Sequence, residues 1–160
     1  MKPERSTIHA NCILIDDIGV LIRGNTGSGK STVSRKLIAA AQASSMFGCL
    51  VSDDRTRLEV QHGRLIARPV EMISGLIEIR GVGIVKVPSE EAAVIRLVID
   101  LTEQAPRMPE EGAETVNLLG VKLPHLVWLK NDDIASYILD VVKGTATGAD
   151  GVHIDFKRLL

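Results

Sequence analysis

A glycine-rich loop that ends in a lysine and a serine is the part of this 160-residue chain whose residue types most clearly carry chemistry. Residues 24–31 match the pattern G-x-x-x-x-G-K-[ST] at every fixed position. In such a loop, backbone N–H groups converge on phosphate oxygens, the lysine adds a positive charge and the serine hydroxyl can ligate Mg²⁺. An ordinary glycine-rich turn is the alternative. We predict a nucleotide-phosphate site made by Gly24, Asn25, Thr26, Gly27, Ser28, Gly29, Lys30, Ser31 and Thr32.

Such a site needs an acidic partner, because the metal that bridges the phosphates must be held and the attacking group must lose a proton. Two apolar strand-like runs end in aspartate, one at Asp53 and Asp54 and the other at Asp100. The run before Asp100 resembles a Walker B strand, but its place in the sheet cannot be derived from the sequence. One helix and one strand separate the first pair from the loop, so βαβ geometry places that pair beside the phosphates. We therefore favour Asp53 and Asp54, with a solvated turn as their alternative.

The elements around the loop occur in the order that a phosphate-binding fold requires. Two β-rich runs at 12–15 and 20–22 are separated by a hairpin turn at 16–19 that closes on glycine, and the second leads into the loop. Apolar residues at helical spacing predict a helix at 31–42, and a short strand follows at 49–52. This order predicts an α/β P-loop nucleotide-binding fold with a mixed β-sheet and a single domain.

The rest of the chain reads mainly as strands. They are expected at 56–60 and 64–67 as an antiparallel hairpin, at 76–79 and 84–87 around a glycine pair, at 94–101, and at 116–129 with breaks at Gly120 and Pro124. A last helix is expected from Asp132 or Asp133 to Lys143, with Gly144 as its stop. We assign residues 1–144 to the catalytic domain and residues 145–160 to a flexible C-terminal tail with a short docking segment at 152–156.

Composition excludes several classes of protein. Aromatic residues make up 2% of the chain and the net charge is −1, so neither stacking platforms nor a broad basic face is available for nucleic acid. No apolar window approaches the length of a membrane span, and the first residues are polar, so we expect a cytoplasmic protein without a membrane partner. Cys12 and Cys49 stand in apolar runs without metal-ligand spacing and are expected to be buried thiols.

Taken together and in order, four segments resemble HPr kinase/phosphorylase. They are Ile8-His9, the loop ending in Gly29-Lys30-Ser31, Val51-Ser52-Asp53-Asp54-Arg55, and the stretch from Ile77 to Val87, which looks like the family's signature segment. The resemblance covers about residues 8–143 and is nearest to a short bacterial form that comprises only the C-terminal catalytic domain. It implies a kinase that uses ATP and Mg²⁺ to phosphorylate a serine of the phosphocarrier protein HPr, in regulation of the phosphotransferase system and carbon metabolism. It also implies removal of that phosphate by inorganic phosphate, and a homo-oligomer, in this family a hexamer.

The resemblance further implies roles for particular residues. Asp53 is the base that accepts the serine proton, and the acid that returns it in the reverse reaction. His9 lies near Asp53 and tunes its proton affinity, and Arg80 neutralises phosphate charge, so these three are the implied catalytic residues. Without the resemblance, His9 would be interpreted as an ordinary boundary residue, and Arg80 as part of the solvent-exposed face of a strand.

The implied metal and phosphate ligands follow from the same match. Ser31 ligates Mg²⁺, Asp54 and Glu78 support the metal and the site geometry, and Lys30 holds the β- and γ-phosphates. Glu78 alternates with apolar neighbours, a pattern that any strand with one solvent-exposed face would also show.

The chain departs from the family pattern at two places. Thr32 stands where the family commonly has an acidic residue after the Lys-Ser pair, and residues 129–133 lack the arginine of a C-terminal loop that helps bind HPr and phosphate. Arg107 and Lys130 are candidates to replace that arginine. Two rival functions stay open: a small-molecule kinase with the acidic loop 102–112 as a lid, and a regulatory module that senses nucleotide without transferring phosphate.

Overall fold

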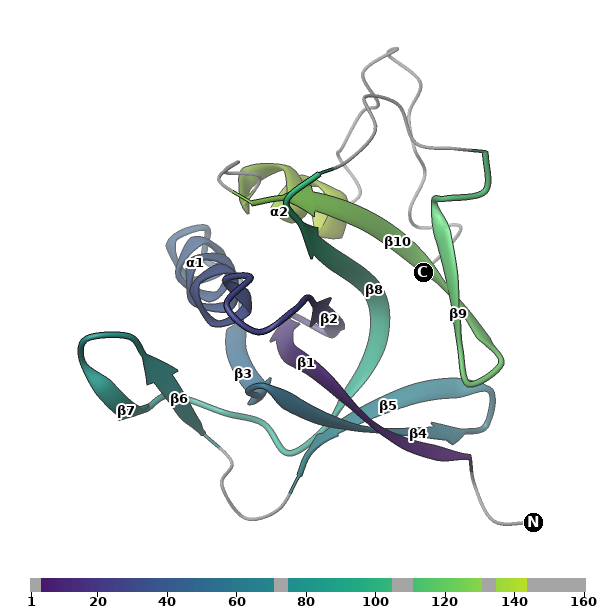
Figure 1. Ribbon diagram of the computed structural model, residues 1–160, viewed down its shortest axis with the longest axis horizontal. Helices are drawn as coiled ribbons and strands as arrows, with labels where there is room; N and C mark the ends of the chain where they lie inside the picture. Colours follow the sequence, from purple (N-terminus) through teal and green to yellow (C-terminus); the bar gives the residue numbers. More distant parts are fainter. Residues whose placement is uncertain (1–3, 71–74, 105–110, 131–134, 144–160) are drawn as a thin grey trace.

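A computed structural model of the chain describes residues 4–70, 75–104, 111–130 and 135–143 (Figure 1). Its elements are β1 (Arg5–Ile15), β2 (Ile18–Arg23), α1 (Lys30–Ala43), β3 (Gly48–Ser52), β4 (Arg55–Gln61), β5 (Arg64–Pro69), β6 (Leu76–Ile79), β7 (Gly83–Lys86), β8 (Ala93–Thr102), β9 (Thr115–Leu118), β10 (Val121–Leu129) and α2 (Ala135–Lys143). The strands pair both parallel and antiparallel, so the predicted α/β fold with a mixed sheet is confirmed.

Two long strands, β1 and β8, each take part in two regions of the sheet. The first half of β1 pairs with β4, and its second half pairs with β2 and β3. Similarly, the start of β8 pairs with β5, and the rest pairs with β2 and β10. Because β4 also pairs with β5, the strands β1, β4, β5, β8 and β2 form a closed ring, which Figure 1 shows as a strongly curved sheet.

Strand direction brings the chemically important segments to one edge. Strand β1 is antiparallel to both β2 and β3, so β2 and β3 run in the same direction on either side of it. Strand β8 is parallel to β2, and β10 is parallel to β8. The glycine loop after β2, Asp53 after β3 and Asp100 in β8 therefore all lie toward the same edge of the sheet.

Apolar residues pack on both faces of the ring strands. Leu21 belongs to a cluster with Cys12, Leu58 and Val98, whereas its neighbour Ile22 belongs to a second cluster with residues of α1 and α2. This alternation is the period of two expected of a strand that is buried on both faces. Helix α1, whose first turn follows the glycine loop, is thereby fixed against β1 and β3.

The two cysteines are buried and free, as predicted. Burial raises the pKa of the Cys12 thiol far above its usual value, and burial raises that of Cys49 to about 11. Neither thiol is activated as a nucleophile.

Two local predictions were wrong. The turn between β1 and β2 contains only Asp16 and Asp17, and Gly19 lies within β2, where an added Cβ would collide with the carbonyl oxygen of Val94 in β8. Gly19 is thus needed for close strand approach rather than for a turn. Pro124 does not interrupt the strand either, because it lies inside β10 opposite Thr115 of β9.

Some predictions fall outside the described residues. These are the helix start at Asp132 or Asp133, the stop at Gly144, Arg107 in the acidic loop, and the tail from 145 to 160. Within the described ranges, neither helix has the length and apolar character needed to cross a membrane.

Candidate active site

The glycine loop adopts the backbone conformation that a phosphate cradle requires. Gly27 and Gly29 have φ angles of 78° and 96°, in the left-handed region that favours glycine. An added Cβ would meet no atom within 4 Å at either position, so backbone conformation, not lack of space, calls for glycine there. Gly29 directly precedes α1, whose N-terminal N–H groups and dipole favour an anion. Ser28 Oγ is buried and has no hydrogen-bond partner among the residues that the structure describes, so the loop retains a polar group for a ligand.

Lys30 is the cationic centre of this loop. Its side chain is 5% exposed, and Nζ donates to the carbonyl oxygens of Gly24 at 3.0 Å and Asn25 at 3.3 Å. Burial lowers the pKa of Lys30, and the nearby charges of Asp54 and Asp53 partly oppose that shift. The ammonium is therefore held in the loop, where it can meet the terminal phosphates of a nucleotide.

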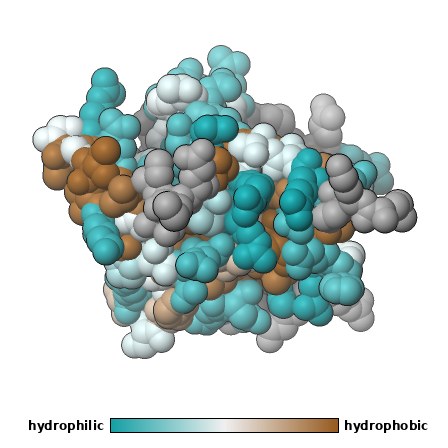
Figure 2. Space-filling view, turned by 90° about the horizontal axis from the view of Figure 1, so that it is seen from below, coloured by the Kyte–Doolittle hydropathy of each residue, from teal (hydrophilic) through white to brown (hydrophobic). Residues whose placement is uncertain are grey.

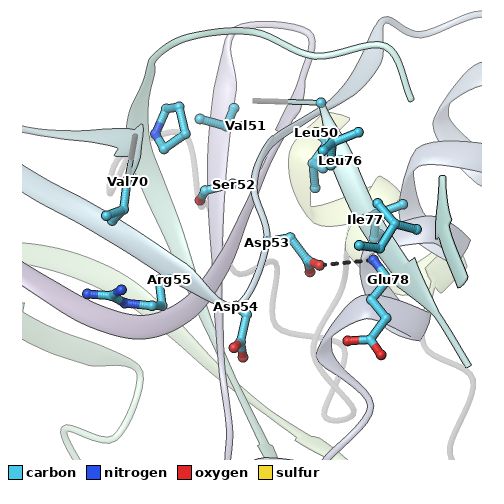
Figure 3. Close-up of a pocket in the computed structure, with 13 residues that line it drawn as sticks. Leu50, Val51, Ser52, Asp53, Asp54, Arg55, Val70, Leu76, Ile77 and Glu78 are labelled. Carbon is cyan, nitrogen blue, oxygen red and sulfur yellow. Dashed lines mark hydrogen bonds between the residues drawn. The ribbon is translucent and has the colours of Figure 1, made fainter. Parts of the chain in front are cut away.

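Asp53 is joined directly to the glycine loop. Its Oδ1 accepts a hydrogen bond of 2.8 Å from the hydroxyl of Ser31, the first-turn residue predicted to ligate Mg²⁺. Its Oδ2 accepts from the backbone N–H of Glu78 at 3.3 Å (Figure 3). Residues 31, 53 and 78 are distant in sequence, and the structure brings them together as predicted.

Asp54 and His9 form the exposed side of the site. His9 Nε2 lies 3.3 Å from Asp54 Oδ1 and 3.0 Å from Lys30 Nζ. The prediction placed His9 near Asp53, and the carboxylate that it contacts is instead the next residue along the chain. The reason is the turn after β3: Asp54 has a left-handed φ of 63°, which carries its side chain toward Lys30.

Glu78 and Arg80 reach the same cleft from the hairpin β6–β7. Both are exposed, whereas Ile77 of β6 is buried and Ile79 is half-buried, so the predicted alternation is correct. A cleft of about 680 Å³ is lined by Thr26, Gly27, Gly29, Lys30, Ser31, Thr32, Arg35, Asp53, Asp54, Glu78, Ile79 and Arg80. The structure thus gathers loop, carboxylates and arginine around one hollow.

A second, smaller hollow of about 280 Å³ lies next to the turn after β3 (Figure 3). Asp53, Asp54 and Glu78 line both hollows, and apolar side chains such as Leu50 and Ile77 line the smaller one. The same hairpin carries Val82 and Ile84, which are 72% and 75% exposed, and Figure 2 shows hydrophobic surface gathered on the side of the molecule where the hairpin lies.

The predicted metal ligands are oxygen donors, which suits Mg²⁺. In the described part of the chain, no group of three or more His, Cys, Asp or Glu side chains could hold a metal ion alone. Ser31, Asp54 and Glu78 would therefore supply part of a coordination shell, with phosphate oxygens and water as the remaining ligands. Magnesium sites of phosphoryl-transfer proteins are commonly built in this way.

Asn11 takes part in the site but was not predicted from the sequence. It is 0% exposed, and its amide contacts Asp53 Oδ1 at 2.8 Å, Ser34 Oγ at 3.1 Å and the backbone N–H of Asp54 at 2.8 Å. The available signal was an amide inside the apolar run from Ala10 to Ile15. A buried amide needs hydrogen-bond partners, which distinguishes it from its neighbours.

Asp100 lies in a strand adjacent and parallel to β2, as a Walker B aspartate would, but its oxygens are already engaged. Arg23 donates to both of them at 2.7 Å, and His125 Nε2 lies 2.7 Å from Oδ2. Burial alone would raise the pKa of Asp100, and the hydrogen bonds from Arg23 and His125 outweigh burial, so the pKa lies below its usual value. The described contacts make Asp100 part of an ion-paired cluster.

Lys130, a candidate for the missing arginine, lies near the other side of the glycine loop. It lines a hollow of about 450 Å³ together with Asn25, Thr26, Gly27, Ser28 and residues 101–104. Its Nζ is 3.4 Å from Glu103 Oε1. Whether it serves phosphate binding stays a prediction.

Comparison with known proteins agrees with this site. The family model described as HPr Serine kinase C-terminal domain matches residues 2–145. This chain belongs to that family. It is similar to the HPr kinase/phosphorylase of Streptococcus thermophilus, with 32% identity over an alignment of 136 positions that covers 77% of this chain and 42% of the relative. The HPr kinase/phosphorylase of Streptococcus mutans is 31% identical over an alignment of 173 positions, which covers 98% of this chain and 54% of the relative.

The fold is similar as well. The structure of the Hpr(Ser) kinase/phosphatase from Coxiella burnetii superimposes with a TM-score of 0.71 and 29% sequence identity, over 86% of this chain and 94% of that chain. The chain spans about half the length of the curated relatives that it matches.

Proposed function

We propose that this chain is an ATP- and Mg²⁺-dependent serine kinase that acts on an HPr-type phosphocarrier protein and also removes the phosphate by phosphorolysis. The observation that carries the proposal is the 2.8 Å hydrogen bond between Ser31 and Asp53. It joins the phosphate-binding loop to a carboxylate that lines a cleft shared with Lys30 and Arg80. Membership of the family and the names of the similar proteins support the choice of HPr as substrate.

In the forward reaction, the serine oxygen of HPr attacks the γ-phosphorus of ATP. The new O–P bond forms as the bond from that phosphorus to the β,γ-bridging oxygen breaks, and ADP leaves. Asp53 accepts the serine proton, Lys30 holds the β- and γ-phosphates and Arg80 offsets the charge on the transferred group. Magnesium, held in part by Ser31, Asp54 and Glu78, would neutralise phosphate charge.

In the reverse direction, an oxygen of inorganic phosphate attacks the phosphorus of phosphoserine. The products are pyrophosphate and serine, and Asp53 returns the proton to the serine oxygen. Residues of the cleft that bind the γ-phosphate in one direction would bind inorganic phosphate in the other. Lys130 and Arg107 stay candidates for assisting this step.

The test is to mix the protein with Mg-ATP and purified HPr and to locate new phosphate by mass spectrometry. We expect one serine phosphate that disappears, with release of pyrophosphate, when inorganic phosphate is added. A chain that binds ATP but leaves HPr unmodified would contradict the proposal and favour the nucleotide-sensing module. Turnover of a metabolite in place of HPr would favour the small-molecule kinase.

Two further predictions belong with this function. A cytoplasmic location and a homo-oligomer, a hexamer by family resemblance, fit a regulator of a phosphocarrier protein. Native mass spectrometry of the purified protein measures the oligomeric state directly.

A further inference from the structure

Asn11 is a fully buried polar residue of β1, between Ala10 and Cys12 of the hydrophobic core. An asparagine amide has two N–H donors and one acceptor oxygen, and leaving them unpaired in a core costs stability. All three find partners at the site: Nδ2 donates to Asp53 Oδ1 and Ser34 Oγ, and Oδ1 accepts from the N–H of Asp54. The side chain therefore spans both carboxylate residues of the turn after β3.

These contacts make the two oxygens of Asp53 unequal. Oδ1 receives hydrogen bonds of 2.8 Å from both Asn11 and Ser31. Among the described residues, Oδ2 receives only the longer bond of 3.3 Å from the backbone N–H of Glu78. The carboxylate is thus fixed through Oδ1, and Oδ2 is the oxygen left for the proton of an incoming hydroxyl.

The same amide supports the backbone of the turn. The left-handed φ of 63° at Asp54 is unfavourable for a residue with a Cβ. The hydrogen bond from the N–H of Asp54 to Asn11 Oδ1, at 2.8 Å, helps hold this conformation. The buried side chain of Asn11 therefore fixes the rotation of the Asp53 carboxylate and the direction of the Asp54 side chain.

We propose that Asn11 is a positioning residue for phosphoryl transfer, which orients Asp53 so that Oδ2 faces the acceptor hydroxyl. This inference rests on the proposed function. It predicts a larger effect on the chemical step than on nucleotide binding, because the amide bonds to Asp53 and Asp54 are 2.8 Å, whereas its contact with Ser31 Oγ of the glycine loop is 3.4 Å.

The main test is Asn11→Asp, which keeps the shape and the acceptor for the N–H of Asp54 but replaces the donor that faces Asp53. We expect kcat for HPr phosphorylation to fall about 10- to 100-fold, as a misplaced catalytic group does, with KM for ATP within about twofold of the parent. A second variant, Asn11→Val, removes both interactions with a side chain suited to a strand, and the same result is expected. It carries the test if Asn11→Asp does not fold.

The matched control is Ser34→Ala, which removes another buried partner of the same amide without touching Asp53. We expect its kcat to stay within about threefold of the parent, since the bond from Asn11 to Asp53 is retained. If Ser34→Ala and the Asn11 variants lose kcat equally, or if the Asn11 variants keep the parent kcat, the positioning role is wrong.

A double-mutant cycle separates this inference from the proposed function. In an Asp53→Asn background, the Asn11 substitutions should lower kcat by less than about threefold more, because the carboxylate on which they act is gone. A full additional loss would show that Asn11 acts elsewhere. If Asp53→Asn itself phosphorylates HPr at the parent rate, the assigned base is wrong, and the proposed function fails on that point irrespective of Asn11.

Discussion

The turn at Asp53–Asp54 and the cluster around Asp100 lie at the same edge of the sheet, yet their carboxylates are held differently. Arg23 donates to both oxygens of Asp100, and His125 contacts Oδ2. Asp53 faces the cleft with one oxygen, and Asp54 has a side chain 63% exposed. An aspartate at a strand end beside a phosphate loop is therefore not sufficient evidence of a catalytic role. The charge that its neighbours supply decides whether it is available to a substrate.

The largest expected effect tests which carboxylate performs chemistry. Asp53→Asn should lower kcat for HPr phosphorylation by about 10²- to 10⁴-fold, because the proposed general base is lost. Nucleotide affinity, measured by calorimetry, should change little. Asp100→Asn should keep kcat near the parent value, because Asp100 is engaged by Arg23 and His125. The reverse pattern would make Asp100 the functional carboxylate.

A smaller effect concerns stability. Asp100→Ala should lower the free energy of unfolding by about 2–3 kcal/mol, because Arg23 and His125 would lose a partly buried partner. Asp54→Ala is the matched control at the exposed turn and should change stability much less. Urea unfolding of the three proteins measures this difference. Equal losses of unfolding free energy in Asp100→Ala and Asp54→Ala would contradict the stabilising role of the Asp100 cluster.

The smallest effect is a dependence of stability on pH. The pKa of Asp100 is lower in the folded protein than its usual value of 3.8, so its ionised form stabilises the fold above that pH. This contribution is lost as the pH falls below about 4 and through the folded-state pKa. Urea unfolding between pH 2.5 and pH 6 should show a steeper loss below pH 4 in the parent than in Asp100→Asn. Parallel curves of unfolding free energy against pH for the two proteins would contradict this contribution of Asp100.

Much of the fold was predictable because its signals are local. The glycine loop, helix α1 and the β4–β5 hairpin each follow from residue types within a short segment. The ring closure was not predictable, because pairing of β8 with both β5 and β2 is a contact between distant segments. Gly19 was misread for the same reason, because its role depends on Val94 of β8, a strand far away in sequence. Pro124 was misread although its partner, Thr115, lies in the preceding strand β9.

The site shows the same division. The loop residues and Asp53 were found from motif and βαβ order, and the structure joins them through Ser31. Asn11 was missed because a single amide in an apolar run does not reveal which partners it meets. The contact of His9 with Asp54 was missed because it depends on a left-handed residue in the turn, which the sequence does not indicate.

Strand β1 passes from one region of the sheet to the other between His9, which is opposite Arg55 of β4, and Ala10, which is opposite Arg23 of β2. His9 and Asn11 are two residues apart and so point to the same face of the strand. A one-residue insertion ahead of them that shifted the register would turn both side chains toward the opposite face. Such a change is opposed by every neighbour of β1 at once, since β2, β3 and β4 each hold it in register. Natural variation in chain length should therefore collect in the connections between strands, while the two-residue spacing of His9 and Asn11 within β1 stays the same.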